Sequence, residues 1–363
     1  MGCNKNSGNA VEATENIVAQ TAERIFADLA DAQTINRDQK GGWKTPLWQA
    51  LTDAGLPLSW VPEDCGGSGA TLAEGFGVLS AAGRFAIGVP LAETMLAGWL
   101  LSQARIGSPA GAMTLAPAGP KDRIAVNADG SLSGRVRGIP FASEAKHIAL
   151  LAQGSAGSSI ALVDAAKCRI ETHLNLGGDS NDTVTFDRVA PVAIKPTPQG
   201  FDHTSLLLMG AVARSLQIAG ALETLLEISV RYSNERVAFE KKISKFQAVQ
   251  HNLAKLAGES AAALAAATSA ADAFATGAAP DAAFLEAASA KIRCAEAAEK
   301  VAAIAHQVHG AIGFSIEHIL HRYSLRALAW RDDFGSESYW AVELGQRVAA
   351  GGADELWPLV ASR

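Results

Sequence analysis

Residues 231–250, RYSNERVAFEKKISKFQAVQ, form the segment that decides how the C-terminal half of this chain folds. The stretch SLLLMGAVARSLQIAGALETLLEISVRYSNERVAF, residues 205–239, has the length and apolar spacing of one long helix. The stretch QAVQHNLAKLAGESAAALAAATSAADAFA, residues 247–275, has the same character and predicts a second helix. The polar residues between the two stretches therefore predict a short break where two helices meet.

Two more helices are predicted after this pair. Gly277 and Pro280 mark a clean break, and residues 281–310 then follow a helical pattern that stops at Gly310. A further helix is predicted from about Glu337 to Val348. The high alanine content allows close approach of helix backbones, so we expect a tight four-helix bundle.

The first third of the chain also reads as helices. Residues 57–69 contain three glycines and two prolines and predict a loop, after which Thr71 or Ser68 could cap the next helix. The apolar spacing predicts helices over residues 15–32, 43–55, 71–85 and 91–106.

Between about residues 112 and 198 the pattern changes to short β-rich runs separated by turn residues. Asp129-Gly130 is a hairpin-type turn signal. Six short strands with alternating polarity predict a small antiparallel barrel or sandwich; they cover residues 122–127, 132–140, 147–153, 158–165, 169–175 and 182–194.

The expected fold class is α+β and mainly α. We predict an N-terminal helical domain over residues 1–111, of which 1–11 are expected to be disordered. A central small antiparallel β-domain then covers residues 112–199, and the C-terminal four-helix bundle covers 200–363. A chain of 363 residues is long enough for two or three domains.

Composition narrows the classes of function. The formal charge of −6 argues against a general nucleic-acid binder. The N-terminus lacks an apolar signal core, and no run reaches the roughly 18 apolar residues of a membrane span. We therefore expect a cytoplasmic protein that is not inserted in a membrane.

Cysteine and histidine spacing gives no metal signature. The four cysteines, Cys3, Cys65, Cys168 and Cys294, lie far apart and form no C-x-x-C pair, so free thiols in a reducing compartment are expected. The eight histidines include two pairs spaced three apart, at 306 and 309 and at 318 and 321, but no third ligand is evident. No metal site is predicted.

The segment quoted first resembles the R-x-x-F-G-x-x-I-x-x-F-Q motif of acyl-CoA dehydrogenases. Arg236, Phe239 and Gln247 match this motif, and Glu240 replaces its glycine. The order of helices, strands and helices also resembles the layout of this family from about residue 12 to 348.

The resemblance implies a chemistry and a cofactor. Family members use FAD to perform the α,β-dehydrogenation of an acyl-CoA thioester, in which a carboxylate removes a proton and flavin N5 accepts a hydride. By resemblance, Arg236, Phe239 and Gln247 contact the diphosphate and adenine of a flavin held mainly by a neighbouring subunit. A guanidinium suits diphosphate oxygens because it presents several fixed donors.

Two other stretches carry the resemblance. In QVHGAIGF, residues 307–314, Gln307, Gly310 and Gly313 match the family's Q-x-x-G-G-x-G-[FY] element, whereas Ala311 replaces its second glycine. The resemblance implies that these three residues also bind the cofactor, although Gly310 could serve only as a helix C-cap. The loop SWVPEDCGGSGATLAE, residues 59–74, resembles a family loop that shapes the acyl pocket.

The family's flavin-ring loop, T-E-P-x-x-G-S-D, is absent. The corresponding stretch is GAMTLAPAGPKDRIAV, residues 111–126, in which Thr114 is the nearest remnant.

The family's catalytic glutamate has no clear counterpart. One family position lies in a sequence like Y-E-G-T, for which Gly335 in WRDDFGSESYW is the closest match. The alternative family position falls on Gly210. The catalytic residue is therefore unknown; Glu337 is a weak candidate beside Asp332 and Asp333, all of which could be solvated loop or N-cap residues.

Three functional hypotheses follow from this resemblance. The first is the smaller, base-lacking subunit of a bacterial heteromeric acyl-CoA dehydrogenase, similar to those of steroid side-chain degradation and paired with a related chain, for example as a heterotetramer. The second is a self-sufficient homo-oligomeric dehydrogenase that uses a displaced base such as Glu337. The third is a non-redox protein with the same fold.

Overall fold

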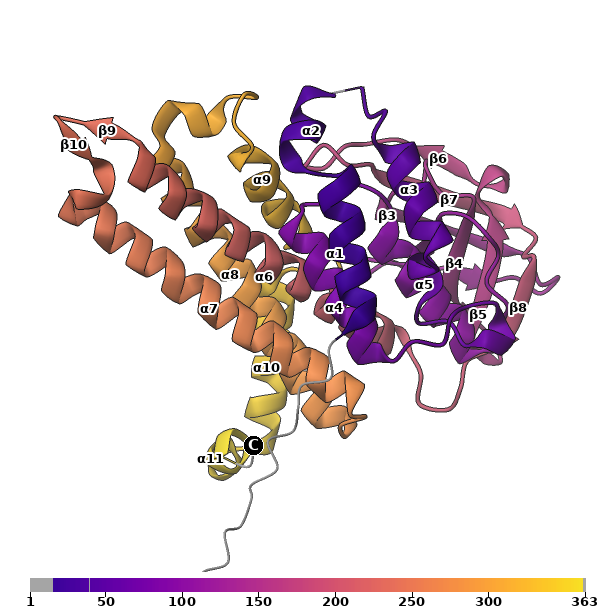
Figure 1. Cartoon of the computed structure of the whole chain (residues 1–363). Coiled ribbons are helices and arrows are strands. Elements are labelled where there is room, and N and C mark those ends of the chain that lie inside the picture. The colour runs from indigo at the N-terminus through magenta and orange to yellow at the C-terminus, as the bar shows by residue number, and fades with distance from the viewer. Residues whose placement is uncertain (1–15, 39, 362–363) are drawn as a thin grey trace, which may run out of the picture.

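The computed structural model describes residues 16–38 and 40–361, so the predicted disorder of residues 1–11 lies outside the described part. Helices come first, strands follow, and long helices complete the chain (Figure 1). The fold is mainly helical, as predicted. The N-terminal helices are α1 (Ile17–Leu29), α2 (Ala32–Arg37), α3 (Lys44–Asp53), α4 (Leu72–Arg84) and α5 (Leu91–Gln103), with 3₁₀ turns η1 (Leu56–Leu58) and η2 (Glu63–Cys65).

Local caps set the bounds of these helices. The Thr71 hydroxyl accepts a hydrogen bond from the Glu74 backbone N–H, and the Glu74 carboxylate accepts one from the Thr71 backbone N–H. This capping box confirms Thr71, and not Ser68, as the cap of α4. Gly55 ends the α3 region with a left-handed φ of 71°, which glycine adopts without strain. The short helix α2 was not predicted.

The central strands form one mixed sheet in the order β6-β7-β3-β2-β4-β5-β8, and β1 pairs with β4. Most pairs are antiparallel, but β1 and β2 each run parallel to β4, so the prediction of a purely antiparallel sheet was wrong. The strands are β1 (Met113–Ala116), β2 (Ala125–Val126), β3 (Leu132–Pro140), β4 (His147–Gly154), β5 (Gly157–Asp164), β6 (Arg169–Glu171), β7 (Asn181–Val189) and β8 (Ala193–Pro196), with a 3₁₀ turn η3 (Ala165–Lys167).

Within residues 112–198, all of which the structure describes, eight strands replace the six that were predicted. β1 was missed because its four residues are all buried and show no alternation. The run predicted over residues 182–194 splits into β7 and β8 near Arg188, which has a φ of 51°, and Pro191, which has no N–H to donate. The turn at Asp129-Gly130 is present, with a φ of 81° at Gly130.

The C-terminal half is built on α6 (His203–Glu235), α7 (Gln247–Ala275) and α8 (Pro280–His309), which pack against one another. The helix α9 (Leu320–Trp330) lies against α6 and α8, and α10 (Glu337–Gly351) lies against α8. The prediction included α10 but missed α9. Two helices, and not one, therefore follow α8 and pack on it. A last helix, α11 (Ala353–Ala361), contacts α10, and the 3₁₀ turn η5 (Gly310–Phe314) joins α8 to α9.

Two glycines fix the crossing of α4 and α6. A Cβ on Gly83 would lie 2.1 Å from the backbone oxygen of Gln217, and a Cβ on Gly220 would lie 2.4 Å from that of Ser80. Both distances are far below van der Waals contact. The N-terminal helices therefore meet the bundle by direct backbone approach, which holds the two regions in one arrangement.

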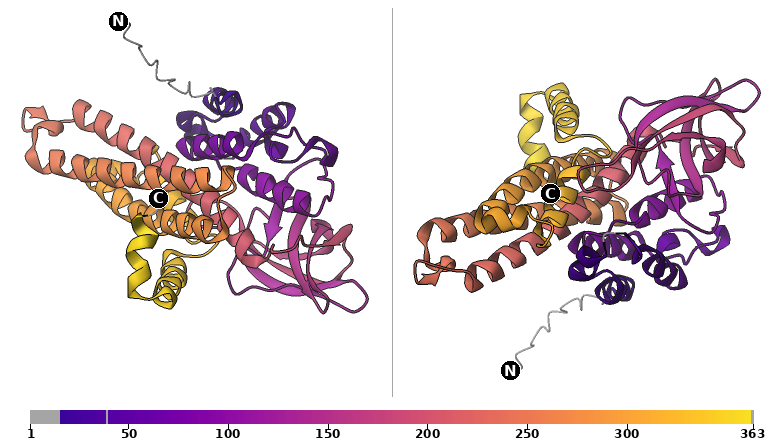
Figure 2. Two further views of the ribbon diagram at one scale, coloured as in Figure 1. Left: turned by 90° about the horizontal axis from the view of Figure 1, so that it is seen from below. Right: turned by 90° about the horizontal axis from the view of Figure 1, so that it is seen from above.

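The views in Figure 2 show the long helices and the strands at opposite ends of the molecule, with the N-terminal helices along one flank of both. α4 packs on α6, and α5 packs on β1, β4 and β5. α6 is apolar and long enough to cross a membrane by composition, contrary to the prediction that no segment is, but 94% of its apolar window is buried in the protein. It is therefore a core helix. The division into three domains stays a prediction.

Candidate functional site

A two-stranded hairpin joins α6 to α7 at the tip of the bundle. β9 (Val237–Ala238) pairs antiparallel with β10 (Lys241–Lys242), and a 3₁₀ turn η4 (Ile243–Lys245) precedes α7. The loop residues Phe239 and Glu240 have φ angles of 51° and 64°. Two consecutive positive φ angles define a type I′ turn, in which glycine is unstrained and glutamate is not. The long helix predicted through residue 239 ends earlier, at Glu235, because this hairpin begins there.

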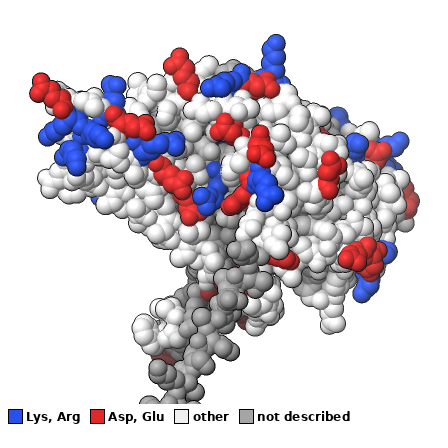
Figure 3. Space-filling model, in the orientation of Figure 1, with Lys and Arg blue, Asp and Glu red and all other residues white. Residues whose placement is uncertain are grey.

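The three predicted cofactor residues of this hairpin face solvent in the single chain. Arg236 and Gln247 are exposed, and Phe239 is 89% exposed. The Phe239 ring lies edge-to-face with that of Phe246, at 6.3 Å between centroids. Positively charged side chains gather on this end of the molecule (Figure 3). The hairpin therefore presents hydrogen-bond donors and an apolar ring on a cationic surface that suits an anionic ligand.

The second predicted motif lies beside this hairpin. Tyr232, one helical turn before Arg236, donates a hydrogen bond from its hydroxyl to the His309 carbonyl at 3.3 Å. The Tyr232 and His309 rings also stack at 4.3 Å between centroids. Since α8 ends at His309, the structure brings the Gln307 element and the hairpin to the same end of the bundle.

The residues of the Gln307 element take different positions. Gln307 is exposed on the last turn of α8, and Gly310 ends that helix with a φ of 65°. Gly313 is buried, and a Cβ there would lie 2.9 Å from Leu320 and 3.1 Å from His309. Gln307 and Gly310 are therefore open to a ligand, whereas Gly313 serves the packing of η5 on α9.

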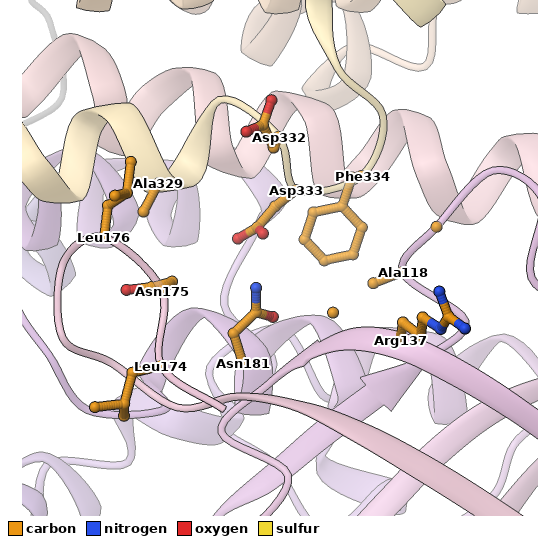
Figure 4. A pocket seen from close by; sticks show the side chains of 12 residues that line it. Ala118, Arg137, Leu174, Asn175, Leu176, Asn181, Ala329, Asp332, Asp333 and Phe334 are labelled. Carbon is orange, nitrogen blue, oxygen red and sulfur yellow. The ribbon is translucent and has the colours of Figure 1, made fainter. Parts of the chain in front are cut away.

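A separate cavity of about 480 Å³ lies between the sheet and the end of α9 (Figure 4). Its floor comes from the loop after β1, from β3 and from the loop before β7, and its roof comes from the segment after α9. Asn181 contributes an amide whose Oδ1 is buried and has no hydrogen-bond partner among the described residues. The lining is Ala118, Gly119, Arg137, Gly138, Leu174, Asn175, Leu176, Asn181, Ala329, Asp332, Asp333 and Phe334.

Phe334 fills the place where a catalytic base was sought. A Cβ added to Gly210 would lie 2.3 Å from the Phe334 ring, so this ring packs directly on Gly210. Matching Gly335 and Ser336 with the G-T of the Y-E-G-T motif puts Phe334, and not Gly335, at the motif's glutamate. Both base positions thus meet at one point, and an apolar ring occupies it.

A buried ion network stands behind this ring. The Arg214 guanidinium donates from Nη2 to Glu93 at 2.5 Å and from Nε to Asp333 at 2.9 Å. Its Nη1 donates to Gln217 at 2.6 Å. Burial raises the pKa of Glu93 and of Asp333, and the charge of Arg214 opposes that rise. Asp333 lines the cavity, but its carboxylate is held by Arg214 and is not free to accept a substrate proton.

Lys291 completes the charge balance of this network. It is fully buried, and its Nζ donates to the carbonyls of Trp330 and Arg331 at the end of α9. Burial lowers the pKa of Lys291 to about 8. These contacts fix the segment that carries Asp333 and Phe334.

Glu337 and Asp332 do not replace the missing base. Glu337 is the first residue of α10, its Oε2 is buried without a hydrogen-bond partner among the described residues, and it is not part of the cavity lining. Asp332 lines the cavity but is exposed. Glu337 therefore stays the weak candidate that the sequence indicated.

Thr114, the remnant of the flavin-ring loop, has a structural role in the sheet. Thr114 lies in β1 and is fully buried, and its hydroxyl donates to the Pro140 carbonyl at 2.6 Å. That hydroxyl is therefore not free to bind a flavin ring. In the loop of residues 59–74, the Glu74 carboxylate caps α4 and Asp64 forms an exposed ion pair with Arg105.

The described residues contain no cluster of three or more histidine, cysteine or acidic side chains that could hold a metal ion. Cys65, Cys168 and Cys294 are free thiols, while Cys3 lies outside the described residues. Instead, the His306 ring stacks on Phe314, and the His309 ring stacks on Tyr232.

Sequence reasoning missed Phe334 and the Arg214 network. The tetrapeptide DFGS carried a usable signal for Phe334, because its last two residues match the G-T of the motif. No pattern in the sequence joins Arg214 to Glu93, which is 121 positions away.

Comparison with known proteins gives a consistent family. The profile described as "Acyl-CoA dehydrogenase, C-terminal domain" matches residues 200–338. Acyl-CoA dehydrogenase IpdE2 of Mycobacterium tuberculosis is 27% identical over 289 residues, which cover 79% of this chain and 81% of that protein. Acyl-CoA dehydrogenase FadE27 of the same organism is 27% identical over 344 residues, with 84% and 88% covered.

Solved structures agree with this comparison. A variant of the steroid ACAD Tcur3481-Tcur3483 superimposes with a TM-score of 0.81 at 26% identity, over 92% of this chain and 97% of that chain. A chain of the ChsE4-ChsE5 complex from Mycobacterium tuberculosis has a TM-score of 0.81 at 24% identity, over 94% and 99%, and so shares the fold.

Proposed function

This chain belongs to the acyl-CoA dehydrogenase family, and on that basis we propose that it is the base-lacking subunit of a heteromeric, FAD-dependent acyl-CoA dehydrogenase. The observation that carries the proposal is that Phe334 packs on Gly210. These two residues occupy the two base positions of the family motifs, and neither of them has a carboxylate. A related chain then supplies the carboxylate and the pocket of the flavin ring.

The residues at the hairpin fit the diphosphate half of FAD. Arg236 and Gln247 offer exposed donors, and Phe239 offers an exposed ring for the cofactor's apolar faces. When bound, the flavin supplies the hydride acceptor of the α,β-dehydrogenation. In this proposal Arg236 neutralises diphosphate charge, Phe239 excludes water from the cofactor, and Gln247, Gln307 and Gly310 complete the polar contacts, while Gly313 holds η5 in place.

The cavity beside Phe334 does not fit a second catalytic centre. The Thr114 hydroxyl donates to a backbone carbonyl, and the carboxylate of Asp333 in the cavity lining is paired with Arg214. A proton acceptor must lie within hydrogen-bond reach of its substrate and be free to accept. This chain therefore contributes binding and orientation, and its partner contributes the base.

The substrate is proposed as an acyl-CoA that carries a ring system. The solved relative at 26% identity is named a steroid ACAD, and its name, Tcur3481-Tcur3483, gives two components. These facts support both a steroid-like acyl group and a paralogous partner, as in a heterotetramer.

Co-expression with a related chain that retains its glutamate tests the proposal. We expect the complex to show the visible spectrum of bound flavin and to oxidise acyl-CoA, while this chain purified alone shows little of either. Full flavin binding and turnover by this chain alone would exclude the proposal. In that case Glu337→Gln tests the self-sufficient alternative, since loss of turnover identifies the displaced base.

A further inference from the structure

Three histidine rings meet where α8 ends and the chain turns toward α9. The His309 ring stacks on Tyr232 at 4.3 Å between centroids, and its centroid lies 4.9 Å from that of His318. His306, one turn earlier on α8, stacks on Phe314 at 4.2 Å. These three histidines, called the histidine corner below, therefore join the end of α8 to α6 and to the segment that leads into α9.

The hydrogen bonds of two of these rings leave no place for a second proton. Nδ1 of His309 donates to the Ala305 carbonyl at 2.8 Å, and its Nε2 is buried without a partner among the described residues. Nε2 of His306 lies 2.8 Å from the Ser324 hydroxyl, and its Nδ1 is buried and likewise without a partner there. A proton on either unpaired nitrogen would be a buried donor with no acceptor, which is costly.

The third ring already uses the nitrogen that would take the proton. Nδ1 of His318 accepts a hydrogen bond from the Leu320 backbone N–H at 3.2 Å, and a proton at Nδ1 would break it. The charged and titratable groups that act on the three rings are Arg231 on α6, His321 on α9 and the rings themselves. Glu317 beside His318 is exposed, and among the described residues no carboxylate acts on the corner. A positive charge there would therefore meet only repulsion.

The packed corner is uncharged at neutral pH. Burial lowers the pKa of His306 and of His318, and it lowers the pKa of His309 to about 4. An exposed histidine has a pKa of about 6.5, so acid favours any conformation that exposes these rings. The Tyr232 ring attracts a cation over its face only modestly, which does not replace the hydration that a buried charge loses. The corner is therefore packed above about pH 6.5 and opens as the pH falls.

The corner carries the Gln307 element. Gln307 and Gly310 lie within three residues of His309, and both are exposed. Tyr232 lies on α6 one turn before Arg236, and its hydroxyl donates to the His309 carbonyl at 3.3 Å. The packed rings therefore fix how the Gln307 element lies relative to the hairpin.

We propose that the histidine corner is a pH-sensitive latch, in which the uncharged rings position the Gln307 element beside the hairpin and protonated rings release it. The release is a property of this chain, whereas the loss of cofactor that follows from it rests on the proposed function. With a pKa of about 4 when packed and about 6.5 when exposed, His309 alone makes the opening constant about 20-fold larger at pH 5 than at pH 7.

Hydrogen exchange of the full-length chain at pH 7 and pH 5 tests the release, after correction for the pH dependence of intrinsic exchange. We expect the amides of residues 310–320 to lose about 20-fold in protection at pH 5. His309→Phe keeps a ring on Tyr232 but cannot titrate, so its protection should change much less. His318→Asn is a second variant, because its side-chain oxygen can accept the same backbone N–H and does not titrate.

His203→Phe is the matched control. Burial also lowers the pKa of His203 to about 4, but this residue lies at the opposite end of α6 from Tyr232. The corner of this variant should therefore respond to pH as in the wild type. Equal protection at both pH values in the wild type, or an unchanged loss of protection in both corner variants, overturns the latch.

The complex with the partner chain tests the consequence for the cofactor. We expect less flavin per complex at pH 5 than at pH 7 in the wild type and in His203→Phe, and a smaller difference in His309→Phe. A corner that opens while flavin stays bound overturns the positioning role. A corner that opens in a complex that binds no flavin at either pH contradicts the proposed function and leaves the latch standing.

Discussion

The hairpin between α6 and α7 and the site around Phe334 differ in whether they keep the residues of the family motifs. At the hairpin, Arg236, Phe239 and Gln247 keep the residues of the family motif and are exposed. At the base site, the two family positions carry Gly210 and Phe334, and both are buried against each other.

This difference has a physical cause. An exposed contact residue contributes little to the stability of the isolated fold, so the fold itself does not dictate which residue stands there. A buried carboxylate that loses its reaction leaves a polar group or a void in the core, and both are destabilising. Filling by an aromatic ring is the stable outcome. On the proposed function, the hairpin therefore serves cofactor binding, and Phe334 fills the position of a base that the partner chain supplies.

The largest expected effect comes from returning a carboxylate to the base site. Gly210→Glu places a Cβ 2.3 Å from the Phe334 ring and a charge in the core. We expect a loss of about 4 kcal/mol or more in the free energy of unfolding, measured by denaturant titration. A well-folded variant would show that the ring does not fill this place.

Two further variants sharpen that result. Gly258→Glu on α7 is the matched control, because Gly258 is exposed and a Cβ there meets nothing within 4 Å. It should be neutral or raise stability by about 0.5–1 kcal/mol through helix propensity. In Gly210→Glu/Phe334→Gly the ring is gone, so the double variant should cost less than the sum of its single changes.

The same contrast explains what the sequence could predict. The long helices, the turn at Asp129-Gly130 and the cap at Thr71 follow from local spacing and were confirmed. The parallel pairing of β1 with β4 and the contact of Phe334 with Gly210 join residues far apart in the chain. No local pattern encodes such contacts, so the filled base site became visible only in three dimensions.

The second prediction concerns pH at the hairpin end of the bundle. Nδ1 of His309 donates to the Ala305 carbonyl, so its buried Nε2 is the unprotonated nitrogen. Burial lowers the pKa of His309 to about 4, and His318 and His306 nearby oppose a further charge. The unfolded chain therefore binds more protons between about pH 4 and 6.5, and stability is full above 6.5 and falls as pH drops toward 4.

We expect this histidine to account for about 1–3 kcal/mol of acid destabilisation across that interval. His309→Phe keeps a ring to stack on Tyr232 but cannot titrate, so its stability should vary less with pH. Denaturant titrations at pH 7 and pH 5 measure the difference. Equal pH dependence in the variant and the wild type contradicts the assignment.

A smaller effect is expected at the hairpin turn itself. Glu240 has a φ of 64° in a type I′ turn, where the family motif has glycine. Glu240→Gly should relieve the strain and raise the free energy of unfolding by about 1 kcal/mol. Glu240→Ala is the control, because it removes the charge but keeps the Cβ, and it should give much less. A gain that both variants share would assign the effect to charge.

The smallest effect on stability, and the one that most directly tests the contrast, is expected from Phe239→Ala. The side chain is 89% exposed, so its removal should change the free energy of unfolding by no more than about 0.5 kcal/mol. In the complex with its partner chain, the same variant should lose bound flavin, because the ring covers the cofactor in the proposed assembly. The flavin absorbance per complex measures this loss.

Trp357→Ala is the matched control for that experiment, since Trp357 on α11 is 75% exposed and lies far along the chain from the hairpin. It should leave the flavin content unchanged. If Phe239→Ala keeps its flavin and its stability, the exposed ring serves neither the fold nor the cofactor. The proposed contrast between a hairpin that binds the cofactor and a base site that has no catalytic role is then wrong. If flavin is lost while stability is kept, the exposed position is maintained by binding alone.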